Sequence, residues 1–165
     1  MTMDAPGYAR SILMAEYQAV EKSIEIVRLK QSGDHTVVAA RFTNGSGRRA
    51  RVMLGMREVD GKWRGTGGFG GLGNSANWGN VSWSSGGWSH GPKIVRGFWI
   101  EHASAASVRL TDSASRVRED KIEGGAAILM WHGHSEGKSA RVELIDAQGD
   151  VIKAGPVWPA PSLTD

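Results

Sequence analysis

The sequence predicts a mainly β fold of the α+β class, with one N-terminal helix on an antiparallel meander and a small β-sandwich or barrel behind it. Apolar residues recur at helical spacing only near the N-terminus, whereas later segments alternate and are separated by turn residues. The 165 residues correspond to one ordinary domain or two very small ones. With 40% hydrophobic and 22% charged residues, the composition is that of a globular protein.

Residues 4–22 are predicted to form the main helix. Asp4 can cap its N-terminus, and Pro6 suits the first turn. Tyr8, Ile12 and Ala19 belong to an apolar stripe that repeats at helical spacing. A stripe of this kind is typical of a helix that buries one face against a sheet.

A run of strands is predicted after the helix, beginning with residues 23–30, 35–42 and 48–59. Residues 31–34 and the glycine-rich residues 43–47 have turn composition. Asp60-Gly61 is a strong signal for a two-residue hairpin, after which a return strand begins at Lys62. Such short connections favour an antiparallel meander.

Residues 65–91 are rich in glycine and tryptophan. Ten of these 27 residues are glycine and none is charged. Trp78, Trp83 and Trp88 recur every five residues, a spacing that puts them on one side of neither a helix nor a strand. We therefore expect a connector held against the protein by its indole rings.

Residues 92–160 return to β patterning, with short strands at intervals of about 8–12 residues, which suggests a small sandwich or barrel. The expected organisation is a helix-plus-meander unit (1–64), a connector (65–91), a second β unit (92–160) and a tail (161–165). Whether the two β units form one domain or two is left open.

Several of these segments resemble a family of uncharacterised two-module extracytoplasmic bacterial proteins. HTVVAARF and MLGMREVDGKWRGTGG are similar to a helix-plus-meander module, and VRGFWIEHASAASVRLTD and ARVELIDAQGDVIKAG to an Ig-like sandwich module beside it. The resemblance covers most of residues 10–155. It implies an Ig-like second unit and an extracytoplasmic domain whose anchor is missing from this sequence, and it supplies no catalytic residues.

The net charge of +3 comes from a basic surplus before residue 65. On a strand, Arg49, Arg51 and Arg57 share one face, with Arg48 just before them. This arginine face is interpreted either as the solvated side of a half-buried sheet or as a patch for an anionic partner. Nucleic acid is not expected as that partner, because no recognition helix, zinc finger or RNP-like run is present.

Several functional classes are excluded or disfavoured by the sequence. The absence of Cys excludes disulfides, thiolate catalysis and Cys-ligated metal sites. Gly68, Gly70 and Gly73 match a dinucleotide fingerprint, but poor helix-forming residues follow it. No nucleophile elbow occurs. No apolar stretch approaches the roughly 18 residues of a membrane span, and no signal peptide is visible.

Two candidate sites remain. His132 and His134 would point the same way on a strand and could share a metal ion, with a third ligand from His102, Glu101 or Glu136. Alternatively, they are an exposed loop pair. The second site is a sugar-stacking platform, in which rings bind pyranose faces and amides bind hydroxyls. It would consist of Trp78, Trp83, Trp88, Asn77 and Asn80.

Together these features predict a non-catalytic extracytoplasmic binding or protein-interaction module that needs no cofactor. Its partner would be a protein of unknown identity or a cell-wall glycan. The first alternative is a carbohydrate- or cell-wall-binding protein that uses the Gly/Trp-rich segment. The second is a metal-dependent hydrolase that uses His132 and His134.

Overall fold

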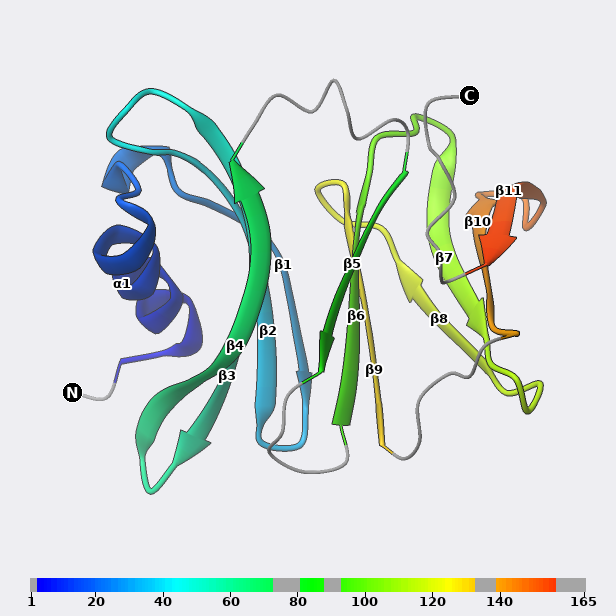
Figure 1. Ribbon diagram of the computed structural model, residues 1–165, viewed down its shortest axis with the longest axis horizontal. Helices are drawn as coiled ribbons and strands as arrows, with labels where there is room; N and C mark the ends of the chain where they lie inside the picture. The colour runs from blue at the N-terminus through cyan, green and yellow to red at the C-terminus, as the bar shows by residue number, and fades with distance from the viewer. Residues whose placement is uncertain (1–2, 73–80, 88–92, 133–138, 157–165) are drawn as a thin grey trace. The chain divides into compact units, whose positions relative to one another are not determined.

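The computed structural model describes residues 3–72, 81–87, 93–132 and 139–156. Within these ranges the protein is mainly β, with antiparallel sheets and a single α-helix near the N-terminus (Figure 1). The predicted fold class is therefore confirmed. The chain divides into two compact units, Met1–Asn74 and Ser75–Asp165, each of which is described by itself.

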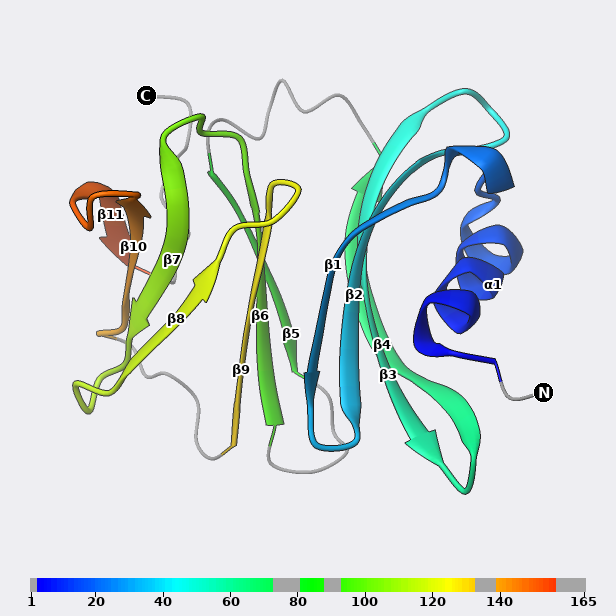
Figure 2. The ribbon, with the colours of Figure 1, turned by 180° about the vertical axis from the view of Figure 1, so that it is seen from behind.

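The first unit consists of a helix and a four-stranded antiparallel meander. The strands lie in the order β1-β2-β3-β4, so that each pairs with its neighbour in the chain. Helix α1 lies against one face of this sheet, as both ribbon views show (Figures 1 and 2). The elements are α1 (Ala5–Tyr17), the 3₁₀ turn η1 (Glu21–Ser23), β1 (Glu25–Ser32), β2 (His35–Thr43), β3 (Arg49–Val59) and β4 (Lys62–Leu72).

Helix α1 begins as its sequence predicts but ends earlier. Asp4 caps it by accepting a hydrogen bond from the Gly7 N–H at 2.8 Å. The helix ends at Tyr17, because Gln18 adopts a left-handed conformation with φ of 54°. Beyond this point the Val20 N–H donates to the Thr43 carbonyl, so pairing with the sheet replaces the predicted helix up to residue 22. In the described part of the chain, no helix is long and apolar enough to cross a membrane.

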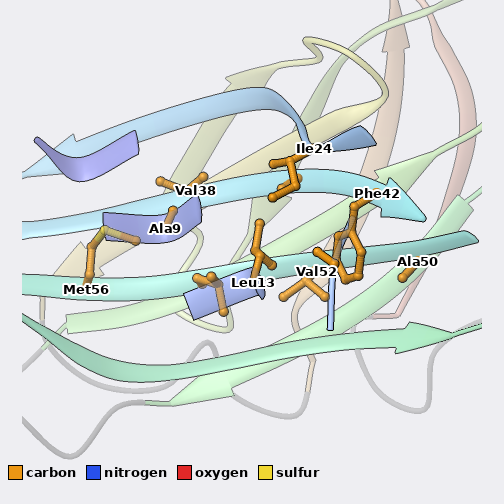
Figure 3. Close-up of a cluster of buried hydrophobic side chains, with 11 residues drawn as sticks. Ala9, Leu13, Ile24, Val38, Phe42, Ala50, Val52 and Met56 are labelled. Carbon is orange, nitrogen blue, oxygen red and sulfur yellow. The ribbon is translucent and has the colours of Figure 1, made fainter. Parts of the chain in front are cut away.

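The core of this unit lies between α1 and the sheet (Figure 3). Ala9 and Leu13 on the helix are fully buried. They pack against alternate residues of the two central strands, as the period of two in a strand requires. The sheet's contribution to this core consists of Val38, Ala40, Phe42, Ala50, Val52, Leu54 and Met56, as the alternation in the sequence predicts.

The second face of this sheet also carries apolar residues at its centre. Val37, Ala39 and Met53 are 0% exposed, although they alternate with the residues of the helix-side core. Both interpretations of the arginine side of this sheet remain predictions. A sheet that is buried on both faces carries near-continuous apolar runs, and residues 37–40 form such a run.

The second unit is a β-sandwich. One sheet has the order β5-β6-β9 and the other β11-β10-β7-β8, and side chains from both sheets form one core that includes Phe98, Leu110, Leu129 and Leu144. The strands are β5 (Val81–Gly87), β6 (Lys93–Ile100), β7 (Ala105–Thr111), β8 (Val117–Lys121), β9 (Ala126–His132), β10 (Arg141–Asp146) and β11 (Val151–Pro156).

The sandwich that the strand spacing predicts is thus confirmed, whereas its Ig-like character is not. In the constant-type immunoglobulin arrangement, the fourth of seven strands pairs with the sheet of the first, second and fifth. Here the fourth strand, β8, pairs instead with the third strand, β7. The resemblance at this level remains a prediction.

The predicted connector, residues 65–91, contains strand residues at both of its ends. Residues 65–72 complete β4 and pair with β3, and residues 81–87 form β5 and pair with β6. Pairing to an established neighbour overrides the low strand propensity of glycine in both cases. The boundary between the two compact units also falls inside this segment.

Candidate functional site

The first unit contains a groove of about 390 Å³ between helix α1 and the β3–β4 hairpin. Side chains of the helix form one wall and residues of β3 the other. Glycines of β4 line the rest of the groove. The lining residues are Tyr8, Ile12, Glu16, Tyr17, Leu54, Gly55, Met56, Gly65, Gly67 and Gly68.

The part of β4 that lines the groove consists of glycines, which have no side chains to fill it. Gly65 stands opposite Met56 and Gly68 opposite Leu54, two residues whose side chains belong to the helix-side core. A strand that carried side chains at these two positions would send them toward the helix. At Gly65 this space is open, because an added Cβ atom would meet only the Tyr8 hydroxyl at 3.8 Å, whereas at Gly68 it would lie 3.0 Å from the Met53 carbonyl oxygen and 3.1 Å from the Leu54 side chain.

The helix is fixed on both sides of the groove. Near its start, the indole N–H of Trp63 donates to the Met3 carbonyl at 2.7 Å, and the Trp63 ring stacks on Tyr8 with centroids 6.4 Å apart. Near its end, Tyr17 packs edge-on against Phe42 at 6.2 Å. Aromatic contacts thus connect the helix to the sheet near both of its ends.

The groove wall combines apolar surface with a few polar groups. Ile12 and the two tyrosine rings supply the apolar part, and the exposed Glu16 supplies a carboxylate. Burial, followed by the charge of Glu16, raises the pKa of Tyr17 above its usual value of 10.0. The protonated form of Tyr17, which can donate a hydrogen bond, is therefore favoured further.

Sequence reasoning did not identify this site. It assigned Tyr8 and Ile12 to the helix core and placed Gly65 and Gly68 in a connector. The trace that the groove leaves in the sequence is a strand start after Asp60-Gly61 followed by glycine at residues 65, 67, 68, 70 and 71. Glycine within a strand can mark the close approach of another backbone or a ligand, but this composition alone does not show which of these glycines face the helix.

The predicted arginine face is only partly open to solvent. Arg48 and Arg49 are exposed, whereas Arg51 is half-buried and stands directly opposite Arg41 on β2. Burial, followed by the charge of Arg41, lowers the pKa of Arg51 from 12.5. The structure thus adds Arg41 to the cluster, and the anionic partner remains a prediction.

Arg57, the fourth of these arginines, is engaged by an acidic residue. Its Nε donates to Asp34 Oδ2, and the other oxygen of Asp34 lies 2.8 Å from Nδ1 of the buried His35. The hydrogen bond from His35, followed by that from Arg57, holds the pKa of Asp34 well below its ordinary value of 3.8. Arg57 is therefore partly neutralised where an anion would have to bind.

The other predicted sites fall largely outside the described residues. Trp78, Trp88, Asn77, Asn80 and His134 lie there, as does the possible ligand Glu136. Trp83 is part of β5 and His132 ends β9, but only their backbones are described. Among the described residues, no three His, Asp or Glu side chains are grouped so as to hold a metal ion. The sugar-stacking platform and the metal pair remain predictions.

No family model, curated protein or solved structure matches this chain. The resemblance to two-module bacterial proteins therefore depends on the sequence segments alone. The proposals below are argued from the geometry of the first unit.

Proposed function

We propose that this chain is a non-catalytic, extracytoplasmic binding module that recognises its partner in the groove beside helix α1. The observation that supports this proposal is the groove itself, in which Gly65 of β4 leaves open space next to Tyr8. Its volume falls in the range of about 300–1,000 Å³ that is common for ligand pockets. Its extracytoplasmic location is proposed from the resemblance.

The chemistry of the lining suits recognition. A ligand pocket is usually lined by apolar and aromatic residues with a few placed polar groups. Here Tyr8, Ile12 and Tyr17 provide the apolar and aromatic contacts, while the tyrosine hydroxyls and the Glu16 carboxylate provide directional ones. These side chains stand on one helix that is held at both ends. The conformational entropy lost when a ligand binds to them would therefore be small.

The proposal is tested by filling the groove. A Cβ atom added at Gly65 would meet only the Tyr8 hydroxyl, at 3.8 Å, so the variant Gly65→Val should fold and project its side chain into the groove. Gly45→Ala is the control, because its Cβ would lie 3.9 Å from the Gln18 carbonyl, in ordinary contact and outside the lining.

Peptides, cell-wall glycans and small metabolites are screened by NMR chemical-shift changes on the full chain. Glycans are included because the tryptophan-rich segment predicts them. We expect a ligand that shifts the resonances of Tyr8, Ile12 and Gly65. Gly65→Val should weaken its binding by about tenfold or more, and Gly45→Ala should leave it unchanged. Binding that Gly65→Val does not affect would contradict the groove as the recognition site.

A further inference from the structure

Strand β4 forms an edge of the first sheet. The order β1-β2-β3-β4 ends there, and in the described parts of the chain β4 pairs only with β3, over its 11 residues from Lys62 to Leu72. An edge strand presents backbone N–H and C=O groups that can pair with another extended chain.

Beyond its start, this edge lacks two of the features that usually prevent such pairing. Proteins protect edge strands with charged residues, proline or β-bulges, and the register of β4 shifts once, between Gly65 and Gly67. Lys62 and Arg64 stand at the start of β4, but residues 65–72 contain neither a charge nor a proline. Residues 67–72, beyond the register shift, are therefore open to the addition of an uncharged extended segment.

The helix-facing side of β4 is a row of glycines. Gly65, Gly68 and Gly70 stand opposite Met56, Leu54 and Val52 of β3. A large side chain across from a strand glycine can cover it and the apolar residues beside it, an effect known as aromatic rescue. An extended peptide added to this edge would place every second one of its side chains beside this row of glycines, next to the groove between β4 and the helix.

From this combination, and on the basis of the proposed function, we propose that the partner is an extended peptide segment that adds to β4 as a further strand. Its large apolar or aromatic residues, at alternate positions, fill the groove between β4 and helix α1. Its backbone completes the hydrogen bonds of the open edge, which is the β-augmentation mode of peptide recognition.

The charges around the groove define the partner further. Glu16 is the ionisable carboxylate of the lining and is exposed, and the β4 residues of the lining are uncharged glycines, with Lys62 and Arg64 standing before them at the start of the strand. A basic side chain next to the apolar residues of the peptide would meet Glu16, whereas an acidic one would be repelled. The partner segment is therefore uncharged along its core, with Lys or Arg preferred over Asp or Glu at the helix side.

The test uses the full chain and a synthetic peptide of about eight residues, the length that spans residues 65–72 at about 3.4 Å per residue. The peptide alternates threonine with phenylalanine or tyrosine and carries one lysine. Three matched peptides replace the lysine by glutamate, scramble the alternation, or carry N-methyl groups on alternate amides. Binding is measured by NMR titration, and the protection of β4 amides by hydrogen exchange.

We expect the parent peptide to bind and to slow amide exchange along β4. N-methylation on the pairing side should weaken binding by about tenfold or more, because it removes backbone hydrogen bonds and keeps the side chains. Glu16→Gln should reduce the preference for lysine over glutamate by severalfold. Gly65→Val should weaken binding, and the Gly45→Ala control should not.

The failure of this inference is distinguishable from failure of the proposed function. If a glycan or metabolite shifts the groove resonances and all four peptides leave them unchanged, the inference that the partner is a peptide is wrong. The proposal that the groove is a binding site is then retained. Equal binding of the parent and N-methylated peptides would overturn strand addition. If no probe of any class shifts the groove resonances, both proposals fail.

Discussion

The guanidinium of Arg118 lies 4.6 Å from the centre of the Trp131 ring. Arg118 stands on β8 and Trp131 on β9, so this cation–π contact joins the two sheets of the sandwich. The same guanidinium donates through Nη1 to Asp112 at 3.1 Å. Because Trp131 is only 6% exposed and belongs to the core, Arg118 ties the edge strand β8 to the centre of the second unit.

Removing this contact should destabilise the second unit. We expect Arg118→Met, which keeps most of the aliphatic stem, to lower the free energy of unfolding by about 1–2 kcal/mol, the range of a partly desolvated cation–π contact. Urea denaturation followed by tryptophan fluorescence measures this change, with the two units fitted as separate transitions.

Arg109→Met is the matched control. Arg109 lies on the neighbouring strand β7, and its Nε is 3.3 Å from the partly exposed Glu119. Because exposed ion pairs contribute only about 0.2–1 kcal/mol, we expect a smaller loss. Equal losses of unfolding free energy for the two substitutions would show that the contact between Arg118 and Trp131 stabilises the unit no more than an exposed ion pair does.

Asp112 should make the second unit sensitive to acid. Its Oδ1 accepts hydrogen bonds from the backbone N–H groups of Ala114 and Arg116, and its Oδ2 from the side chains of Arg116 and Arg118. The backbone N–H of Arg116 is the largest of the causes that lower the pKa of Asp112 from 3.8 to about 2. The ionised form is therefore favoured in the folded protein.

Because the folded pKa lies below the unfolded one, the stabilisation by Asp112 is complete above about pH 4. It is lost as the pH falls from about 4 to about 2. We expect Asp112→Asn to be less stable than the natural chain at pH 7 and to converge with it near pH 2. Thermal unfolding of both proteins between pH 2 and 7 measures this, and a constant difference over the range would contradict the assignment.

The elements of the first unit could be predicted because local signals and tertiary pairing agree there. The turn at residues 31–34 separates the segments that form β1 and β2, and the Asp60-Gly61 hairpin ends the segment that forms β3. The helix start was also predictable, since Asp4 makes the capping hydrogen bond that its position suggests.

The candidate groove could not be predicted, because it depends on side chains that are missing. Hydrophobic periodicity reports residues that pack, and Gly65 and Gly68 add nothing to such a pattern. Only the pairing of β4 with β3 shows that they face the core opposite Met56 and Leu54. The sheet orders of the second unit are equally non-local, since β10 pairs with β7 across the intervening chain.

The core of the first unit should be sensitive to the loss of Leu13. Leu13 is 0% exposed and packs into the cluster beneath the helix, whereas its neighbour Met14 is 37% exposed. We expect Leu13→Ala to lower the free energy of unfolding by about 2–5 kcal/mol and Met14→Ala to change it by less than about 0.5 kcal/mol. Urea denaturation followed by circular dichroism measures both, and a small effect of Leu13→Ala would contradict the described core.

The end of helix α1 offers a stabilising substitution. Gln18 follows the helix with φ of 54°, while its carbonyl accepts the Gly45 N–H at 2.9 Å. A residue with a Cβ atom pays about 1 kcal/mol to adopt this left-handed conformation, and glycine does not. Since the flexible unfolded chain offsets part of the gain, we expect Gln18→Gly to raise the free energy of unfolding by about 0.5 kcal/mol.

Met14→Gly provides the contrast for this substitution. Met14 lies inside α1, where glycine costs about 1 kcal/mol relative to alanine, so the same new residue should destabilise the first unit there. Amide hydrogen exchange of β2, a central strand of the sheet, reports the stability of the unit for both variants. Opposite signs at positions 14 and 18 are expected because one residue is helical and the other left-handed. A loss of protection in Gln18→Gly would show that the Gln18 side chain, rather than its backbone, holds the helix end.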